Sequence, residues 1–425
     1  MAHQPTPEAA RRPSADSDGQ SDIAFVGGGF RTTTFLSSAP GLLRRRIRVY
    51  ERGTTIGPGG FARYGITTTS IGSRFFTHLE LTGPFAPLAH TSALTEVAHA
   101  DQPVDMPRLA AALTALGGSL KDALGPHGLR LGTAVVAVHA DRESRRVVLE
   151  LADGSTESAR HAVLATGRTE RPHPELLPWR AKVLPSGTVI ATRHRQEIKD
   201  RLLAAADRPV VVAGSSHSAM SALQTLLDLR AELRSEHPGA LLPAVQVVRR
   251  GPARLMYDSA DLARTGQLPG RERPFDPAAD VCPATGIVYR DSGLRHQSRA
   301  LYCALWAGDV PGATLVDAPV LADASDRLTA AALIVQALGY HGQAPDIHLD
   351  GVLARPADSS ARLLADDDGA LVLNGTAHPL LSVLRVEPTP LDRRDNSAYA
   401  SDLYTRLADR LNRLAAPVAG AGVGR

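Results

Sequence analysis

The sequence contains few cysteines. Two, Cys282 and Cys303, occur in 425 residues, and they are too far apart to form a CxxC pair. This spacing argues against a disulfide framework, a zinc site built on paired cysteines and a dithiol redox pair. We therefore expect no metal and a cytoplasmic location.

Lysine is also scarce, since Lys121, Lys182 and Lys199 are the only lysines and arginine carries nearly all the positive charge. The arginines are interspersed with acidic residues, and the formal net charge is +3. No basic patch typical of nucleic-acid binding is visible. No apolar run approaches the roughly 18 residues that a membrane span needs. We expect neither a nucleic-acid nor a membrane partner.

Aromatic residues are few, with eight phenylalanines, eight tyrosines and two tryptophans, so the core must be mainly aliphatic. Hydrophobic residues make up 43% and charged residues 21%, close to the averages of globular proteins. At about 150 residues per domain, the length allows two or three folded units. Residues 1–20 are polar and hold three prolines, which predicts a disordered tail rather than a signal peptide.

Two parts of the chain predict the same strand–turn–helix–strand unit. Each begins with a short apolar run that ends in glycine, continues with helical spacing and returns as a second apolar run. The first unit has strands at 23–27 and 46–51, and the second has strands at 208–214 and 244–249 around a helix at 218–233. A later strand ending in glycine follows each unit, at 161–167 and at 333–340.

Other segments predict the elements between and after these units. The pattern indicates helices at 109–124 and 401–414, and a hairpin with strands at 133–138 and 146–151. Residues 292–302 predict a connector and a helix that leads back to the first unit. We expect the glycine-rich residues 419–425 to be a frayed tail.

The first glycine turn has the features of a dinucleotide site. Gly27, Gly28 and Gly29 allow a tight turn and a close approach of a pyrophosphate to the positive end of a helix. Glu51 ends the second strand, where an acid accepts hydrogen bonds from the adenosine ribose. Thr32 stands where the pattern has its third glycine. An ordinary glycine turn in a doubly wound sheet is the alternative interpretation.

This turn, the Ala-Thr-Gly segment 165–167 and the long connection at 57–76 together resemble the superfamily of flavoproteins with two dinucleotide-binding domains. The second turn, 212–219, is similar to the GxGxSA turn of flavin-dependent monooxygenases that hydroxylate nitrogen or sulfur, with Ser216 in place of its middle glycine. The segment 337–340 resembles the return strand of the N-hydroxylating group, with Leu338 in place of threonine. The resemblance extends from residue 21 to about 414.

The resemblance implies an α/β fold of two Rossmann-like, three-layer dinucleotide-binding domains, the second inserted in the first. It assigns residues 21–205 and 341–425 to an FAD-binding domain and residues 206–340 to an NAD(P)-binding domain. The implied FAD contacts are Gly27, Gly28, Gly29, Thr32, Glu51, Val136, Thr166 and Gly167. The implied NADPH contacts are Gly214, Ser215, Ser216, Ser218, Arg249 and Arg250.

The choice of NADPH over NADH depends on two arginines. Arg249 and Arg250 follow the strand after the second turn, where NADPH-dependent enzymes place cations for the 2′-phosphate, and no acid stands there in the sequence. Salt bridges at a solvated surface are the ordinary alternative. His217, inside the second turn, points at the nicotinamide nucleotide or at solvent.

The substrate site is less defined. Tyr64, Phe75 and Phe76, in the long connection after Glu51, and His194 are the candidates for substrate contacts, and Arg295 and His296 are candidates for substrate or phosphate contacts. Superfamily members usually end in a strand that carries a glycine, and the stretch 380–387 has none. Glu387 is the candidate substitute.

We therefore predict an FAD- and NADPH-dependent oxidoreductase, foremost a single-component monooxygenase that oxidises nitrogen or sulfur in a small molecule of specialised metabolism. A homo-oligomer is compatible with the sequence. One alternative is a flavin reductase, dehydrogenase or oxidase with the same fold. Another is a non-catalytic nucleotide-binding protein, suggested by the replacements at Thr32, Ser216 and Leu338 and by the missing glycine.

Overall fold

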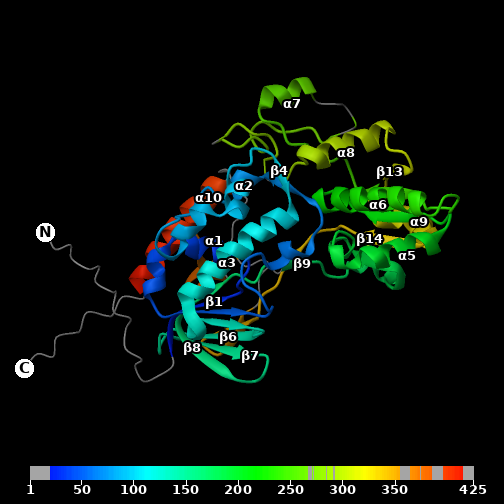
Figure 1. Ribbon diagram of the computed structural model, residues 1–425. Coiled ribbons are helices and arrows are strands. Elements are labelled where there is room, and N and C mark those ends of the chain that lie inside the picture. Colours follow the sequence, from blue (N-terminus) through cyan, green and yellow to red (C-terminus); the bar gives the residue numbers. More distant parts are fainter. Residues whose placement is uncertain are drawn as a thin grey trace, which may run out of the picture.

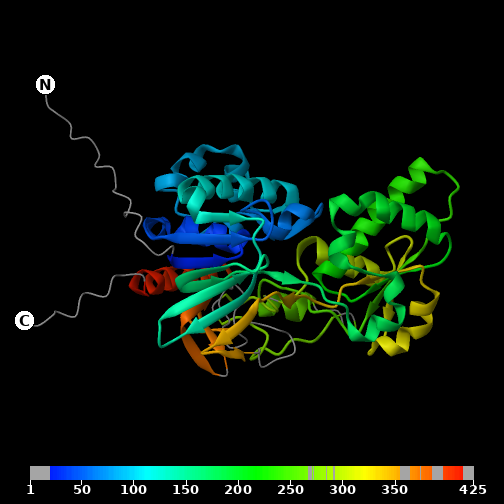
Figure 2. The same cartoon turned by 90° about the horizontal axis from the view of Figure 1, so that it is seen from below.

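The computed structural model describes residues 20–266, 270, 272–283, 285–290, 292–354, 364–373, 375–384 and 396–414, with only the helical backbone for residues 396–401. Glu387, the tail at 419–425 and all but the last residue of the tail at 1–20 lie outside these ranges. Two domains lie side by side (Figures 1 and 2).

The first domain is built on a parallel sheet with the strand order β5–β2–β1–β8–β20. Buried aliphatic residues form its strands, as expected for a sheet that is covered on both faces. Its strands are β1 (Ser21–Val26), β2 (Ile47–Glu51), β5 (Leu129–Leu131), β8 (Thr156–Leu164) and β20 (Thr376–Val383).

Helices cover one face of this sheet and a second β layer covers the other. The helices are α1 (Phe30–Ser38), α2 (Ser92–Ala98), α3 (Met106–Gly128) and α10 (Asn396–Leu414). The opposite layer continues from β8 through β7 (Arg146–Leu151), β6 (Val135–Asp141), β16 (Asp346–Leu349) and β17 (Val352–Ala354), while β19 (Ala370–Leu373) and β18 (Leu364–Ala365) extend the edge at β20. A separate strand pair joins β3 (Thr67–Ile71) to β4 (Pro103–Asp105).

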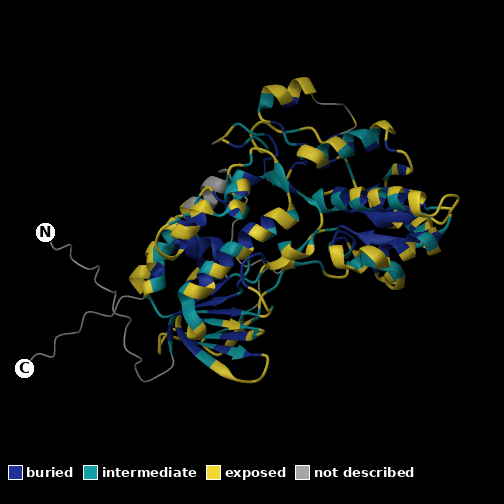
Figure 3. Cartoon of the chain, viewed as in Figure 1, coloured by how far each residue is buried: buried dark blue, intermediate teal, exposed yellow. Residues whose placement is uncertain are grey.

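The second domain is a five-stranded parallel sheet with helices on both faces. Its order is β10 (Val183–Pro185), β14 (Leu333–Gln336), β11 (Val210–Ala213), β12 (Val245–Arg249) and β13 (Ala313–Asp317). The helices are α4 (Ser186–Val189), α5 (Arg195–Ala205), α6 (His217–Glu236), α7 (Ala260–Gly266), α8 (His296–Ala307) and α9 (Ser325–Ala330). The central strands of both sheets are buried, whereas the edge strands β5, β10 and β13 are partly exposed (Figure 3). The predicted α/β class, with one dinucleotide-binding fold inserted in the other, is confirmed.

Two short strands mark where the chain passes between the domains. β9 (Arg168–Thr169) leads out of the first domain and pairs antiparallel with β15 (His341–Gly342), which leads back. Because β10 belongs to the second sheet and α5 packs on α6, residues 183–205 lie in the second domain, ahead of the boundary predicted at 206. The helix predicted to lead back to the first domain is α8, which belongs to the second domain and packs on α6 and β13.

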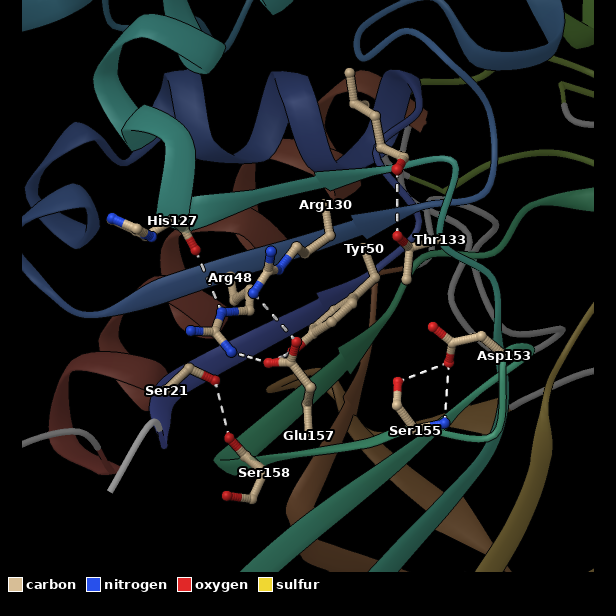
Figure 4. Close-up of polar contacts among 11 residues, drawn as sticks. Ser21, Arg48, Tyr50, His127, Arg130, Thr133, Asp153, Ser155, Glu157 and Ser158 are labelled. Atoms are coloured by element: carbon tan, nitrogen blue, oxygen red, sulfur yellow. Dashed lines mark hydrogen bonds and ion pairs between the residues drawn. The ribbon is translucent and has the colours of Figure 1, made fainter. Parts of the chain in front are cut away.

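A polar network ties the strands of the first sheet together beside the end of α3, where the Nε of Arg48 donates a hydrogen bond of 3.3 Å to the carbonyl oxygen of His127 (Figure 4). Glu157 of β8 forms ion pairs with Arg48 of β2 and, at 3.5 Å, with Arg130 of β5. Its carboxylate also accepts a hydrogen bond of 3.1 Å from the hydroxyl of the buried Tyr50. One carboxylate therefore links three strands whose sequence positions are far apart.

Candidate dinucleotide and substrate sites

The first glycine turn is packed tightly against the segment where the chain leaves the first domain. Gly27 has a φ of +105°, and a Cβ atom there would lie 2.4 Å from the carbonyl oxygen of Ala165. The amide of Ala165 donates to the carbonyl of Val26. Only glycine suits this position, since it combines a left-handed conformation with the close approach of a backbone oxygen.

Glu51 is held beside this turn. Its carboxylate accepts hydrogen bonds of 2.7 Å from the backbone amides of Gly28 and Gly53. A Cβ on Gly28 would lie 3.0 Å from the Cβ of Glu51, so the turn and the end of β2 are nearly in contact. Gly29 precedes the first residue of α1, whose amide end faces the same place. The acid and the helix start therefore meet as a bound adenosine ribose and pyrophosphate would require.

Thr32 replaces a glycine without opening the turn. Its side chain is fully buried, and its hydroxyl donates a hydrogen bond of 2.5 Å to the carbonyl oxygen of Gly27. The hydroxyl therefore fastens the first turn of α1 to the glycine turn. Thr166 is half-buried and Gly167 exposed in the segment that packs against this turn, and Val136 of β6 is 42% exposed.

The second glycine turn repeats the geometry of the first. Gly214 has a φ of +121°, and a Cβ there would lie 2.4 Å from the carbonyl oxygen of Ala337. Ser216, which replaces the middle glycine, is exposed, and its hydroxyl lies 3.0 Å from that of Ser218. Ser215 is half-buried beside them. The replacement therefore adds a hydroxyl at the surface of the turn and crowds nothing.

His217, the first residue of α6, turns its ring inward rather than to solvent. Its Nε2 lies 3.1 Å from the carbonyl oxygen of Gly293, which can only accept, so Nε2 carries the proton. Burial, aided by Arg295, lowers the pKa of His217 to about 4, so the ring is neutral at pH 7. Its Nδ1 is left as a buried acceptor without a hydrogen-bond partner among the described residues.

Arg249 has a different role from the predicted one. Its side chain is buried, and its guanidinium forms an ion pair with Asp317 of β13 and a hydrogen bond with the hydroxyl of Tyr302. The sequence has no acid next to Arg249, but the neighbouring strand β13 places Asp317 beside it. Arg250 is exposed and stays the candidate for a 2′-phosphate.

Four chain segments meet in a polar network where the domains are joined. Glu170, just after β9, accepts hydrogen bonds from the hydroxyl of Ser186 at 2.7 Å and from the amide of Gly187 at 2.8 Å. The hydroxyls of Tyr64, from the first domain, and of Tyr340 lie beside Gly187, 3.5 and 3.8 Å from where a Cβ of that residue would be. Burial raises the pKa of the Glu170 carboxyl and those of both tyrosines. Tyr64 therefore lies at the junction of the domains.

The other substrate candidates are dispersed. Phe76 is 6% exposed and packs in the core of the first domain, which removes it from any ligand surface. Phe75 lies in a ring cluster with Phe30 and Phe61, with centroids 6.0 and 6.4 Å away. His194 places Nδ1 3.0 Å from the carboxylate of Glu197 at the start of α5. The structure does not bring these four predicted residues together in one pocket.

A cleft between the domains has two of the predicted contact residues in its lining and adds others that were not predicted. It encloses about 120 Å³ and is formed by β3 of the first domain and by α6 and the start of α8 in the second. Arg295 and His296 line it, together with hydroxyl and amide side chains. The signal in the sequence was weak, because the three segments lie at 65–69, 220–228 and 295–301.

No protein-family model matches the chain. A curated relative, the CMP-5′-(3-aminopropyl)phosphonate hydroxylase of Streptomyces rubellomurinus, is 31% identical over 350 residues, which cover 74% of this chain and 76% of the relative. The chain belongs to the N-hydroxylating flavin-dependent monooxygenases. The predicted family, and with it an FAD- and NADPH-dependent enzyme, is confirmed.

Solved structures show the same fold for this monooxygenase. An ornithine N-hydroxylase from Kutzneria sp. 744, with reduced FAD, NADP+ and L-ornithine, has a TM-score of 0.58, with 17% identity over 93% of this chain and 99% of that one. A cadaverine monooxygenase from Erwinia amylovora, bound to FAD, has a TM-score of 0.60, with 16% identity over 94% and 96%. The ornithine hydroxylase of Pseudomonas aeruginosa has a TM-score of 0.56, with 12% identity over 92% and 99%.

The residues of the monooxygenase fit its two cofactors. Glycine at positions 27 and 214 forms a tight turn just before a helix, and Glu51 stands beside the first turn. The unpartnered Nδ1 of His217 offers an acceptor at the second turn. Among the described residues, no group of three histidine, cysteine or acidic side chains could hold a metal ion. No helix among the described residues is long and apolar enough to span a membrane.

Proposed function

We propose that this monooxygenase hydroxylates the primary amine of a small substrate that also carries a nucleotide-linked phosphonate or phosphate. The observation that supports this is the 31% identity, over most of both chains, with a hydroxylase of CMP-5′-(3-aminopropyl)phosphonate. The reaction converts R–NH2, O2, NADPH and H+ into R–NHOH, H2O and NADP+. When bound, FAD would supply the redox and oxygen-activating chemistry.

The residues of this chain bind and orient the partners of that reaction. We assign FAD to Gly27, Gly28, Gly29, Thr32, Glu51, Val136, Thr166 and Gly167. We assign NADPH to Gly214, Ser215, Ser216, Ser218 and Arg250, and leave Arg249 out because its guanidinium is used by Asp317 and Tyr302. No protein nucleophile is required, because the reactive groups belong to the cofactors and the substrate.

The orphaned acceptor of His217 defines one contact in this proposal. Because Nε2 carries the proton, Nδ1 can only accept, and it requires an N–H or O–H donor. A bound nicotinamide nucleotide offers such donors in its carboxamide and ribose hydroxyls. We propose that His217 orients this half of the cofactor as a neutral ring, since its pKa of about 4 keeps it unprotonated near neutral pH.

The proposal is tested with the purified, FAD-loaded protein under 18O2. We expect CMP-5′-(3-aminopropyl)phosphonate to accelerate NADPH oxidation and to yield a product with one labelled oxygen on nitrogen. Ornithine and free 3-aminopropylphosphonate serve as comparison substrates. NADPH oxidation that yields only hydrogen peroxide with every amine would contradict the proposal and favour an oxidase of the same fold.

Two further expectations belong to this proposal. We propose that the enzyme works in the cytoplasm, where NADPH is regenerated, and that it forms a homo-oligomer. Fractionation of the producing cells and light scattering of the purified protein would check these two statements.

A further inference from the structure

The cleft between the domains lies beside the nicotinamide turn but is not part of it. None of the residues of the two glycine turns lines it. The cleft starts on α6 at Met220, one helical turn after His217, and reaches α8 at Arg295, two residues after Gly293. Since the carbonyl of Gly293 binds His217, the cleft and the second turn share a wall.

The cleft has a buried floor and a polar, exposed mouth. Thr68 and Ser298, at 4% and 8% exposure, and the apolar Met220 form the floor. The side of α6 that faces the cleft continues at spacings of three and four residues to Gln224 and Asp228, which are exposed at the mouth. The cleft encloses about 120 Å³ and is open at its mouth, so a ligand larger than this space extends out toward solvent.

The charged groups of the cleft suit a ligand that carries a pair of hydroxyl groups as well as a negative charge. Asp228 is held in place by a hydrogen bond of 2.8 Å from the Nε2 of Gln224 to its carboxylate. A carboxylate can accept both hydrogen bonds of a vicinal diol, as the acid of a dinucleotide fold does with ribose. Arg295, on the α8 wall, presents a guanidinium, the group best suited to bind phosphate oxygens in pairs.

We propose that this cleft binds the nucleoside 5′-monophosphate part of the substrate, with the phosphate at Arg295 and the ribose hydroxyls at Asp228. Hydroxyl and amide side chains of β3 and α8 then face the base. Because Arg295 is close in sequence to Gly293 and hence to the nicotinamide turn, a ligand anchored there extends its aminoalkyl end toward the site of reaction. The inference rests on the proposed function and adds the location of its nucleotide.

The test measures binding to the oxidised, FAD-loaded protein and requires no turnover. Cytidine 5′-monophosphate, cytidine and inorganic phosphate are titrated by calorimetry against the natural protein and against Arg295→Gln and Asp228→Asn. We expect cytidine monophosphate to bind, Arg295→Gln to weaken it about tenfold or more, and cytidine to be insensitive to that change. Asp228→Asn should weaken the binding of both cytidine and cytidine monophosphate by several-fold.

Two matched controls accompany these variants. Asp200 of α5 accepts the same kind of hydrogen bond from Gln196, four residues earlier, so Asp200→Asn repeats the Asp228 change outside the cleft. Arg264→Gln removes an exposed arginine that pairs with Asp261. Both should bind cytidine monophosphate like the natural protein, and NADP+ should bind equally to all variants.

The proposal is overturned if cytidine monophosphate does not bind, if either cleft variant binds it unchanged, or if NADP+ displaces it one for one. These outcomes are separate from a failure of the proposed function. If the protein hydroxylates free 3-aminopropylphosphonate or ornithine and the cleft variants do not change this activity, the amine hydroxylation is supported and the nucleotide site in the cleft is contradicted.

Discussion

Gly214 lies directly against the carbonyl of Ala337, as Gly27 lies against that of Ala165. In each domain, the strand that ends in Ala-x-Gly passes over the glycine turn of the strand beside it, and a Cβ at the glycine would lie 2.4 Å from the alanine oxygen. These two contacts couple the dinucleotide turns to the segments that carry the chain from one domain to the other. A substitution at either glycine must therefore disturb both its own turn and the segment that packs against that turn.

We predict that Gly214→Ala weakens NADP+ binding strongly and lowers the free energy of unfolding by about 2–4 kcal/mol, because the added methyl must displace backbone. Urea unfolding and NADP+ titration measure the two effects. Gly239→Ala is the matched control, since Gly239 also has a positive φ, +95°, but no atom within 4 Å of its added Cβ. It should cost about 1 kcal/mol and leave NADP+ binding unchanged. Equal losses in both variants would show that only the backbone conformation matters.

We predict opposite consequences for the two adjacent arginines. Arg249→Met should lower the free energy of unfolding by about 2 kcal/mol, since it leaves the buried hydroxyl of Tyr302 without its guanidinium partner, and should leave the ratio of NADPH to NADH use unchanged. Arg250→Ala should barely change stability and raise the KM for NADPH about fivefold to tenfold, with no effect on NADH. Steady-state kinetics with both nucleotides decide. A change of nucleotide preference in Arg249→Met would contradict the role of Arg249 as a structural residue.

The sequence carried the local features of the two turns. An apolar run that meets glycine can only end a strand in a tight turn, and this placed Gly27 and Gly214 correctly. Helical spacing also indicated α3 and α10. The predicted end at 124 coincides with a kink of α3 (Met106–Gly128) at Gly125, whereas α10 begins at Asn396, ahead of the predicted 401. Such features depend on neighbouring residues, so one sequence suffices to find them.

Contacts between distant segments were beyond the sequence. Asp317 lies 68 residues after Arg249 and meets it only because β13 pairs with β12. In the sequence, Thr32 only replaces the third glycine of the pattern. The hydrogen bond from its hydroxyl to the carbonyl oxygen of Gly27 forms in the folded turn and is not visible in the sequence. The network around Glu170 and the cleft near Arg295 assemble from several segments, and no spacing in the sequence connects them.

We predict that Glu157 contributes measurably to the stability of the first domain. Glu157→Gln keeps the shape of the side chain but removes the charge that pairs with Arg48 and Arg130, and should lower the free energy of unfolding by about 1–3 kcal/mol. Glu150→Gln is the control, because Glu150 is 47% exposed and pairs only with His139, at 3.5 Å, among the described residues. It should change stability by less than about 0.5 kcal/mol. The midpoints of urea unfolding compare the two, and equal effects would contradict the prediction.

We predict that acid weakens the fold through its buried histidines. His161 is 2% exposed, lies 2.9 Å from the hydroxyl of Ser382, and has its pKa lowered from 6.5 to about 3 by burial and by Arg410. Burial also lowers the pKa values of His78 and His217 to about 4. Each ring gains its proton in the unfolded chain first, so its contribution is fully present above pH 6.5 and is lost as the pH falls below it. The loss is at most about 1.4 kcal/mol per pH unit for each histidine.

Urea unfolding between pH 7.5 and 5 measures this slope. His161→Gln removes one of these buried rings, so its stability, although lower at pH 7.5, should fall less steeply toward pH 5 than that of the natural protein. His99→Gln is the control, because His99 is exposed on the surface after α2, and it should leave the slope unchanged. If His161→Gln and the natural protein lose stability in parallel, the ring of His161 is protonated in the folded chain and the polar contact with Ser382 must differ from the one described.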